Sequence, residues 1–160
     1  MSRTADLMTD LEAFRKLVPL DHGLVVVSTS RSNGTIQSSV VNAGVLDHPL
    51  HGRPIVAFVA AGSSRRLVNL RARPRATVVI RAGWQWAGVE GPVELAGHDD
   101  PLKGIDGERL RLLLREIFTA AGRHPRRFRG VRPGHGRGAT GCSPRRARAR
   151  LRLSGGAATE

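Results

Sequence analysis

The chain has few of the residues that would place it in an oxidising compartment or across a membrane. Cys142 is its one cysteine among 160 residues, so an intrachain disulfide and a cysteine metal cluster are excluded. No apolar run approaches the roughly 18 residues that a membrane-spanning helix needs. Residues 1–16 alternate in charge and lack the apolar stretch of a secretory signal. These absences predict a cytoplasmic location and no membrane partner.

Acidic residues are nearly missing from the C-terminal end of the chain. Residues 1–122 hold 15 Lys+Arg and 12 Asp+Glu, a net charge of +3, whereas residues 123–160 hold 11 Arg and one acid, a net charge of +10. The total charge of +13 is therefore mainly a property of the tail. This shift predicts two parts, one domain of ordinary size over 1–122 and an Arg/Gly/Pro/Ala-rich tail over 123–160.

Three interpretations of the tail at 123–160 stay open. The first is a frameshift, because Arg, Gly, Pro and Ala are encoded by GC-rich codons and the tail holds little else. The second is a disordered, solvating tail, for which this composition suffices. The third is a nucleic-acid-binding arm whose arginines neutralise phosphates. We favour them in that order, so nucleic acid is not the expected partner.

Short β-branched segments separated by turn residues dominate the rest of the chain. Asn33-Gly34 is typical of a tight hairpin turn, and the continuous apolar run at 55–59 is typical of a strand covered on both faces. The expected strands lie at 24–30, 35–41, 55–59, 76–80 and 84–95, and the expected helices at 9–18, 64–71 and 108–120. This order predicts a mainly β fold with peripheral helices, arranged as a closed or nearly closed barrel that leaves few strand edges exposed.

Arg65 and Arg66 are the first candidates for a binding site. They open the expected short helix directly after Gly62-Ser63-Ser64, where free backbone N–H groups and two guanidinium groups favour a phosphate. A solvated basic face is an equally good interpretation of the local pattern, because charge runs are usually soluble surface. Asn69, on the same helix, is by pattern a routine helix-surface residue rather than a cofactor contact.

The tryptophans and histidines each allow two interpretations. Trp84 and Trp86 are two residues apart, so on a strand they share one face. They could stack near a flavin-like ring, but a core or dimer-interface role is favoured for such a pair. His48, His51 and His98 lie in expected loops, where exposed histidines are favoured over metal ligands because no convergence is visible. No metal site is expected.

Several motifs in one order give a more specific resemblance. They are Gln37-Ser38-Ser39, the run GSSRRLVNLRARP at 62–74, the run GWQW at 83–86 and the run VEGPVEL at 89–95. With them, residues 23–100 resemble the pyridoxamine 5′-phosphate oxidase-like split β-barrel superfamily. More narrowly, the chain is similar to the actinobacterial branch of that superfamily, which uses the deazaflavin coenzyme F420 in place of FMN.

The resemblance implies an FMN-binding-like split β-barrel that forms a homodimer with cofactor sites at the subunit interface. It implies an F420-dependent oxidoreductase that transfers a hydride between the reduced deazaflavin and a small organic acceptor. An FMN-binding enzyme of the same fold and a non-catalytic cofactor-binding protein are the alternatives. By this analogy Arg65 and Arg66 hold the cofactor phosphate with Asn69 nearby, while Gln37, Ser39 and Val41 line the ring, largely through backbone. No catalytic side chain is assigned.

The resemblance ends at Ala121-Gly122. Relatives would continue there with an acidic segment, a second helix and a closing strand, so the closing segment is expected to be lost or replaced in this chain. Loss of that strand would expose a barrel edge. We would then expect this particular chain to fold poorly and to bind its cofactor weakly.

Overall fold

The computed structural model describes residues 11–122 and the backbone of 147–151. Seven strands form one sheet in the order β5-β4-β1-β2-β3-β7-β6, and every neighbouring pair is antiparallel. The strands are β1 (Leu24–Ser30), β2 (Ile36–Asp47), β3 (Pro54–Ala61), β4 (Arg75–Ala82), β5 (Gln85–Pro92), β6 (Glu94–Ala96) and β7 (Ala147–Leu151). The helical elements are residues 11–17, the 3-10 turn η1 (Val18–Asp21), α2 (Arg65–Ala72) and α3 (Gly107–Ala120).

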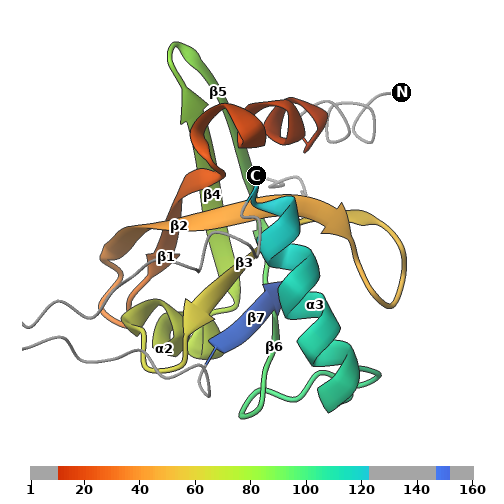
Figure 1. Cartoon of the computed structure of the whole chain (residues 1–160). Coiled ribbons are helices and arrows are strands. Elements are labelled where there is room, and N and C mark those ends of the chain that lie inside the picture. The colour runs from red at the N-terminus through yellow and green to blue at the C-terminus, as the bar shows by residue number, and fades with distance from the viewer. Residues whose placement is uncertain (1–10, 123–146, 152–160) are drawn as a thin grey trace, which may run out of the picture.

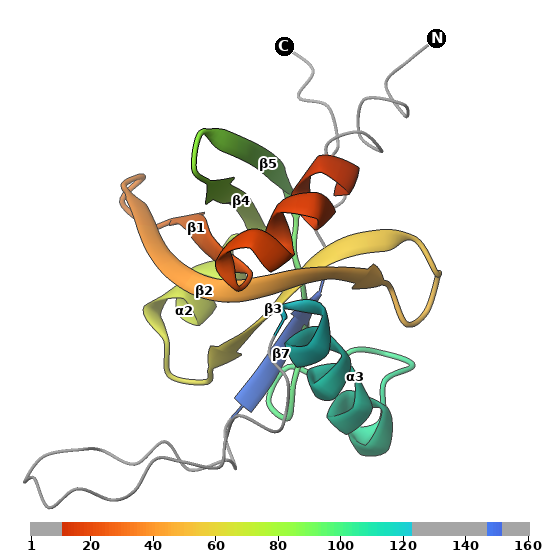
Figure 2. The ribbon, with the colours of Figure 1, turned by 45° about the horizontal axis from the view of Figure 1, so that its top comes forward.

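The long strand β2 divides the sheet into two halves. Its first part pairs with β1, from Ser30↔Ile36 to Leu24↔Asn42, and its second part pairs with β3, from Ala43↔Phe58 onward. The half β5-β4-β1-β2 and the half β2-β3-β7-β6 therefore share this one strand, which runs across the whole molecule in Figure 1 and Figure 2. The expected mainly β architecture is confirmed, and β2 is longer than its sequence pattern predicted.

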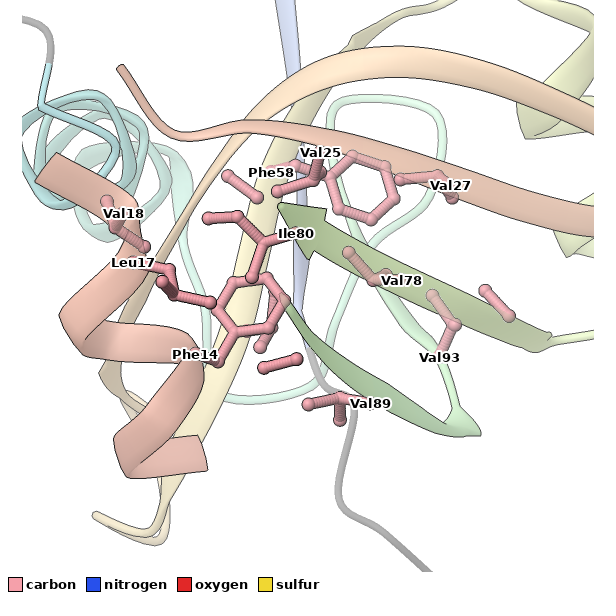
Figure 3. Close-up of a cluster of buried hydrophobic side chains, with 14 of the residues drawn as sticks. Phe14, Leu17, Val18, Val25, Val27, Phe58, Val78, Ile80, Val89 and Val93 are labelled. Carbon is pink, nitrogen blue, oxygen red and sulfur yellow. The ribbon is translucent and has the colours of Figure 1, made fainter. Parts of the chain in front are cut away.

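The core lies between the two halves, under the N-terminal helix. Phe14 is fully buried and packs with strand residues that alternate along β1, β3 and β4, including Val27, Phe58 and Ile80 (Figure 3). The opposite face of β3 is buried too, because Ile55 and its neighbours contact α3. The run at 55–59 is thus covered on both faces, as its continuous apolar character predicted.

Local chemistry sets where the helices begin and end. Asp106 precedes α3 and its Oδ1 accepts a hydrogen bond from the Arg109 backbone N–H at 2.8 Å, which satisfies one of the free donors at the helix start. The helix α2 ends at Ala72, ahead of Pro74, which disfavours a helical residue before it. None of the helices in the described ranges combines the length and apolar character that crossing a bilayer requires.

The position expected to lack a closing strand is filled. The backbone of Ala147–Leu151 forms β7, which pairs with β3 on one side and with β6 on the other. The closing segment was expected to be either lost or replaced, and the structure agrees with replacement. Because β7 pairs with both β3 and β6, the strand edge that loss of the segment would have exposed is covered. Residues 123–146 and 152–160, on which the three interpretations of the tail mainly depend, lie outside the described residues.

Candidate functional site

The helix α2 brings four of the six candidate residues into two hydrogen-bonded pairs. Arg66 Nε donates to Ser39 Oγ at 2.9 Å. One turn further along, Asn69 Nδ2 donates to Gln37 Oε1 at 2.9 Å and to Thr29 Oγ1 at 3.1 Å. Gln37 and Ser39 share one face of β2 because they are two residues apart on a strand. These contacts tie the helix to the hairpin of β1 and β2.

Asn69 is buried, with only 4% of its surface exposed. Its sequence pattern indicated a helix-surface residue, and that interpretation is wrong. The amide turns toward β1 and β2, where Thr29 is exposed by only 2%. A buried polar group needs hydrogen-bond partners, and the two strands supply them.

A depression of about 520 Å³ lies beside these pairs, between α2 and the hairpin turn. Arg65 and Asn69 are part of its wall, together with Arg31 and Arg73. The hairpin holds two of these guanidinium groups, since Arg31 Nη1 donates to the Ile36 carbonyl at 3.1 Å and Arg73 Nε donates to the Ser30 carbonyl at 3.1 Å. The full wall is Arg31, Ser32, Arg65, Val68, Asn69, Ala72 and Arg73.

The positive charge of this depression is not neutralised within the described part of the chain. None of Arg31, Arg65 and Arg73 forms an ion pair there. Arg71, on the same helix, differs because it makes a bidentate pair with Asp100 at 2.7 Å for both contacts, and the hydrogen bond with Asp100 raises the pKa of Arg71. The interpretation as a solvated basic face fits the exposed Arg65, Arg71 and Arg75, but Arg66 and Arg73 are partly buried.

Arg66 is half-buried, and desolvation by burial lowers the pKa of its guanidinium from the ordinary value. An arginine keeps its charge at neutral pH after such a shift because its ordinary pKa is so high. Arg66 is therefore a partly desolvated cation held by Ser39. A cation in such a place interacts more strongly with an anion than a fully solvated one does.

Val41 is the candidate that the structure places apart. It lies on the same face of β2 as Gln37 and Ser39, but its side chain packs against the hydrophobic core. The residues that sequence reasoning missed are Arg31, Arg73 and Thr29. The strongest signal for Arg31 was its place directly before the Asn33-Gly34 turn, although nothing in the local pattern shows that this turn lies beside α2.

Burial corrects the interpretation of His48 and the core alternative for the two tryptophans, while their dimer-interface alternative stays a prediction. Trp84 is fully exposed and Trp86 is 70% exposed, so the pair is not part of the core of this chain. His48 is not an exposed loop histidine, because it is buried at 3% and its Nε2 lies 2.9 Å from Glu94 Oε2. His51 stacks on His48 with ring centroids 3.7 Å apart. No group of three potential metal ligands is found among the described residues.

We compared the chain with protein families, curated proteins and solved structures. No family model and no curated protein matches the sequence. Among solved structures, a pyridoxamine 5′-phosphate oxidase-related, FMN-binding protein from Nostoc punctiforme PCC 73102 matches with a TM-score of 0.59 at 17% identity, over 96% of this chain and 81% of the other. The conserved hypothetical protein Rv2991 from Mycobacterium tuberculosis matches with a TM-score of 0.55 at 14% identity, also over 96% and 81%.

A heme binding protein from Mycobacterium smegmatis also matches, with a TM-score of 0.51 at 13% identity over 87% of this chain and 50% of the other. That protein binds heme and the Nostoc protein binds FMN, so one architecture serves different ligands. The likeness to the Nostoc protein extends over nearly the whole of this chain. The chain therefore has the split β-barrel fold of pyridoxamine 5′-phosphate oxidase-like, FMN-binding proteins.

Proposed function

We propose that this chain binds a phosphorylated flavin-type cofactor at the arginine-lined depression and uses it as an oxidoreductase. Coenzyme F420 is the cofactor that the sequence motifs favour, and FMN is the alternative. The observation that carries the proposal is that Arg31, Arg65 and Arg73 line one hollow without an ion pair among the described residues, next to the half-buried Arg66. The acceptor would be a small organic molecule.

The depression suits the anionic end of such a cofactor. Its volume of about 520 Å³ falls within the range of roughly 300–1,000 Å³ that is usual for small-ligand sites. Guanidinium groups bind phosphate oxygens through paired N–H donors. Arg31 and Arg73 are already oriented by hydrogen bonds to hairpin carbonyls, so less conformational entropy is lost when they meet a ligand.

The polar pairs beside the depression would hold the part of the cofactor that bears the ring. Gln37 and Ser39 lie next to α2, and each is held by a side chain of that helix. A bound flavin or deazaflavin supplies the two-electron hydride chemistry, and the protein supplies orientation and charge. We assign no catalytic side chain, because the wall of the depression holds no carboxylate, imidazole or thiol.

A non-catalytic cofactor-binding protein is the second candidate function. The heme binding neighbour from Mycobacterium smegmatis suggests heme as the ligand to consider for it. Haem iron is held by His, Cys, Met or Tyr. The wall of the depression contains none of these residues. An anionic cofactor without a protein-ligated metal is therefore the better match to the described site.

Fluorescence titration of the purified chain with F420 and with FMN tests the proposal. We expect saturable binding of at least one of them, with F420 binding tighter, because the sequence motifs favour it. Turnover of reduced cofactor with a panel of small organic acceptors then separates an enzyme from a carrier. Absence of binding of both cofactors, in a sample with a cooperative thermal melt, would reject the proposed function.

The outer face of the half-sheet β5-β4-β1-β2 indicates a second copy of the chain as partner. Strand register places Val79, Val26 and Val40 side by side in one row across three strands. Val26 is 41% exposed and Val40 is 62% exposed, and Trp86 lies on the same outer face. Contiguous exposed apolar area of this kind marks an interaction site.

A positive charge lies on one side of this valine row and a negative charge on the other. In a two-fold symmetric dimer, the positive side of one copy would therefore face the negative side of the other. Arg81 lies two residues from Val79 in one direction, and Glu90 lies opposite Thr77, two residues away in the other direction. Rotation of a second copy about an axis along the row would bring arginine of one copy toward glutamate of the other. We propose on this basis that the protein is a homodimer through this face.

Val40→Lys is expected to convert the dimer into a monomer. A lysine there keeps its charge in water in the free chain but would be buried, without a partner, in the face-to-face dimer. Sedimentation velocity at several concentrations measures the result. Leu112→Lys on α3 is the matched control, because Leu112 is also exposed, at 41%, and lies away from the sheet face. Dimers of unchanged affinity in Val40→Lys would place the interface elsewhere.

A further inference from the structure

The amide of Asn69 uses both of its hydrogens inside the protein. One is donated to Thr29 Oγ1 on β1 at 3.1 Å and the other to Gln37 Oε1 on β2 at 2.9 Å. Asn69 and Thr29 are exposed by only 4% and 2%. The three side chains come from α2, β1 and β2 and form one short hydrogen-bonded chain that ends at the partly exposed Gln37.

We propose that Asn69 is a positioning residue that fixes the orientation of the Gln37 amide. Because the Gln37 carbonyl accepts from Asn69, the NH₂ group of Gln37 is the end left for a ligand. Ser39 is oriented in a similar way. Its hydroxyl oxygen accepts a hydrogen bond from Arg66 Nε, so its hydroxyl hydrogen remains free to be donated to a ligand. The two residues of β2 therefore offer hydrogen-bond donors.

The reverse orientation of the Asn69 amide is disfavoured. Gln37 and the Thr29 hydroxyl would then both donate to the Asn69 carbonyl. The NH₂ group of Asn69, with two donors, would be left without those acceptors in a residue that is 4% exposed. The observed orientation gives both Asn69 amide hydrogens an acceptor within the protein, and the reverse orientation would lose both of these bonds.

The ligand chemistry follows from this direction. A row made of the Gln37 NH₂ group, the Ser39 hydroxyl and the Arg66 guanidinium suits an edge of acceptors, such as carbonyl or anionic oxygens. It disfavours an edge that itself donates hydrogen bonds. This inference rests on the proposed function, because it concerns the ring-bearing part of the cofactor at the same site. Asn69 would then act on the ring-bearing part of the ligand through Gln37, although it is also part of the wall of the depression.

The first test uses the ligand-free protein. In ¹⁵N-labelled wild-type protein we expect the side-chain NH₂ resonances of Asn69 to be protected from solvent exchange and those of Gln37 to exchange rapidly. Assignment follows from the loss of each signal in Asn69→Leu and Gln37→Leu. Protection of Gln37 together with rapid exchange at Asn69 would overturn the proposal, whether or not any cofactor binds.

The second test is a double-mutant cycle with FMN and F420 affinity as readout. Asn69→Leu keeps the size and the neutral charge of the side chain, and is expected to weaken binding by about tenfold in the wild-type background. In the Gln37→Leu background the same change should alter affinity less than twofold, because the group that Asn69 orients is gone. An equal loss in both backgrounds would mean that Asn69 contacts the ligand directly and would overturn the positioning role.

The two tests separate the inference from the function on which it rests. Failure of wild-type protein to bind either cofactor rejects the proposed function, while the exchange experiment still decides the orientation of the amides. Normal binding with equal losses in the cycle rejects the positioning role alone. Thermal melts of each variant check that Asn69→Leu folds, and the exchange result decides the matter where it does not.

Discussion

Replacement of Arg65 and Arg66 together by alanine is expected to raise the Kd for the bound cofactor roughly 100-fold, on the order of 3 kcal/mol. Arg65 is a wall residue of the depression and forms no ion pair within the described residues. Arg66 is half-buried beside Ser39, so its charge is poorly screened by water. Each removed guanidinium takes away charge-assisted hydrogen bonds to phosphate, and Arg31 and Arg73 remain to support residual binding.

Fluorescence titration at two salt concentrations measures this loss. The matched control is Arg53→Ala with Arg115→Ala, which removes the same net charge from exposed positions outside the depression. The control should change affinity only slightly, and the change should vanish at higher salt because distant surface charges are screened. If the Arg65/Arg66 double variant binds as tightly as its control, the cofactor phosphate lies elsewhere.

Gly44→Ala is expected to destabilise the fold by about 3 kcal/mol or more, since overpacking that moves backbone exceeds the usual cost. Gly44 lies on β2 where α3 crosses it. A Cβ atom built there would lie 2.6 Å from Ala120 Cβ, 2.5 Å from the Ala120 carbonyl oxygen and closer still to its carbonyl carbon. Most of the obstructing atoms belong to the helix backbone, so a rotamer change cannot relieve the clash and α3 must move away from the sheet.

The control for Gly44→Ala is Gly107→Ala. Gly107 is the first residue of α3, and a Cβ atom there meets nothing within 4 Å. Alanine is the better helix former, so this variant should be neutral or slightly stabilised. Thermal and urea unfolding of both variants measure the difference. A melting temperature for Gly44→Ala equal to that of the wild type would show that α3 does not pack on β2 as closely as described.

The elements of this fold are predictable from sequence because they depend on neighbours along the chain. The alternation at 24–30 gives β1 with its observed bounds, and Asn33-Gly34 gives the turn that follows, where Gly34 has a φ of +81° and Asn33 Oδ1 accepts from Thr35 N–H. The apolar stripe of α3 and its acidic cap are equally local. Hydrophobic alternation, helix caps and turn residues each act over a few neighbouring residues. They can therefore be recognised in the sequence without knowledge of the tertiary structure.

The site could be predicted only in part, since its members are distant in sequence. Arg65 and Arg66 were candidates from their place at a helix start, whereas Gln37 and Ser39 came only from a resemblance. The contacts that join them, Asn69 to Gln37 and Arg66 to Ser39, span 32 and 27 residues. Arg73 reaches a carbonyl 43 residues away, and Asn69 reaches Thr29 across 40 residues. No periodicity within one segment carries information about such pairs.

Amino-acid order alone thus determined β1, β3, β4 and the helices to within a few residues, the hairpin turn and the division of charge at residue 122, because each depends on propensity and spacing over short lengths. The single strand expected at 84–95 is instead two strands, β5 and β6, and β2 continues six residues beyond its expected end at 41. Tertiary packing decided that Asn69 is buried, that Trp84 and Trp86 are exposed and that β7 occupies the place between β3 and β6. It also decided that arginines from the hairpin and from α2 face one hollow. The physical reason is that burial and hydrogen-bond partners are properties of the assembled sheet, which exists only once strands far apart in the chain have paired.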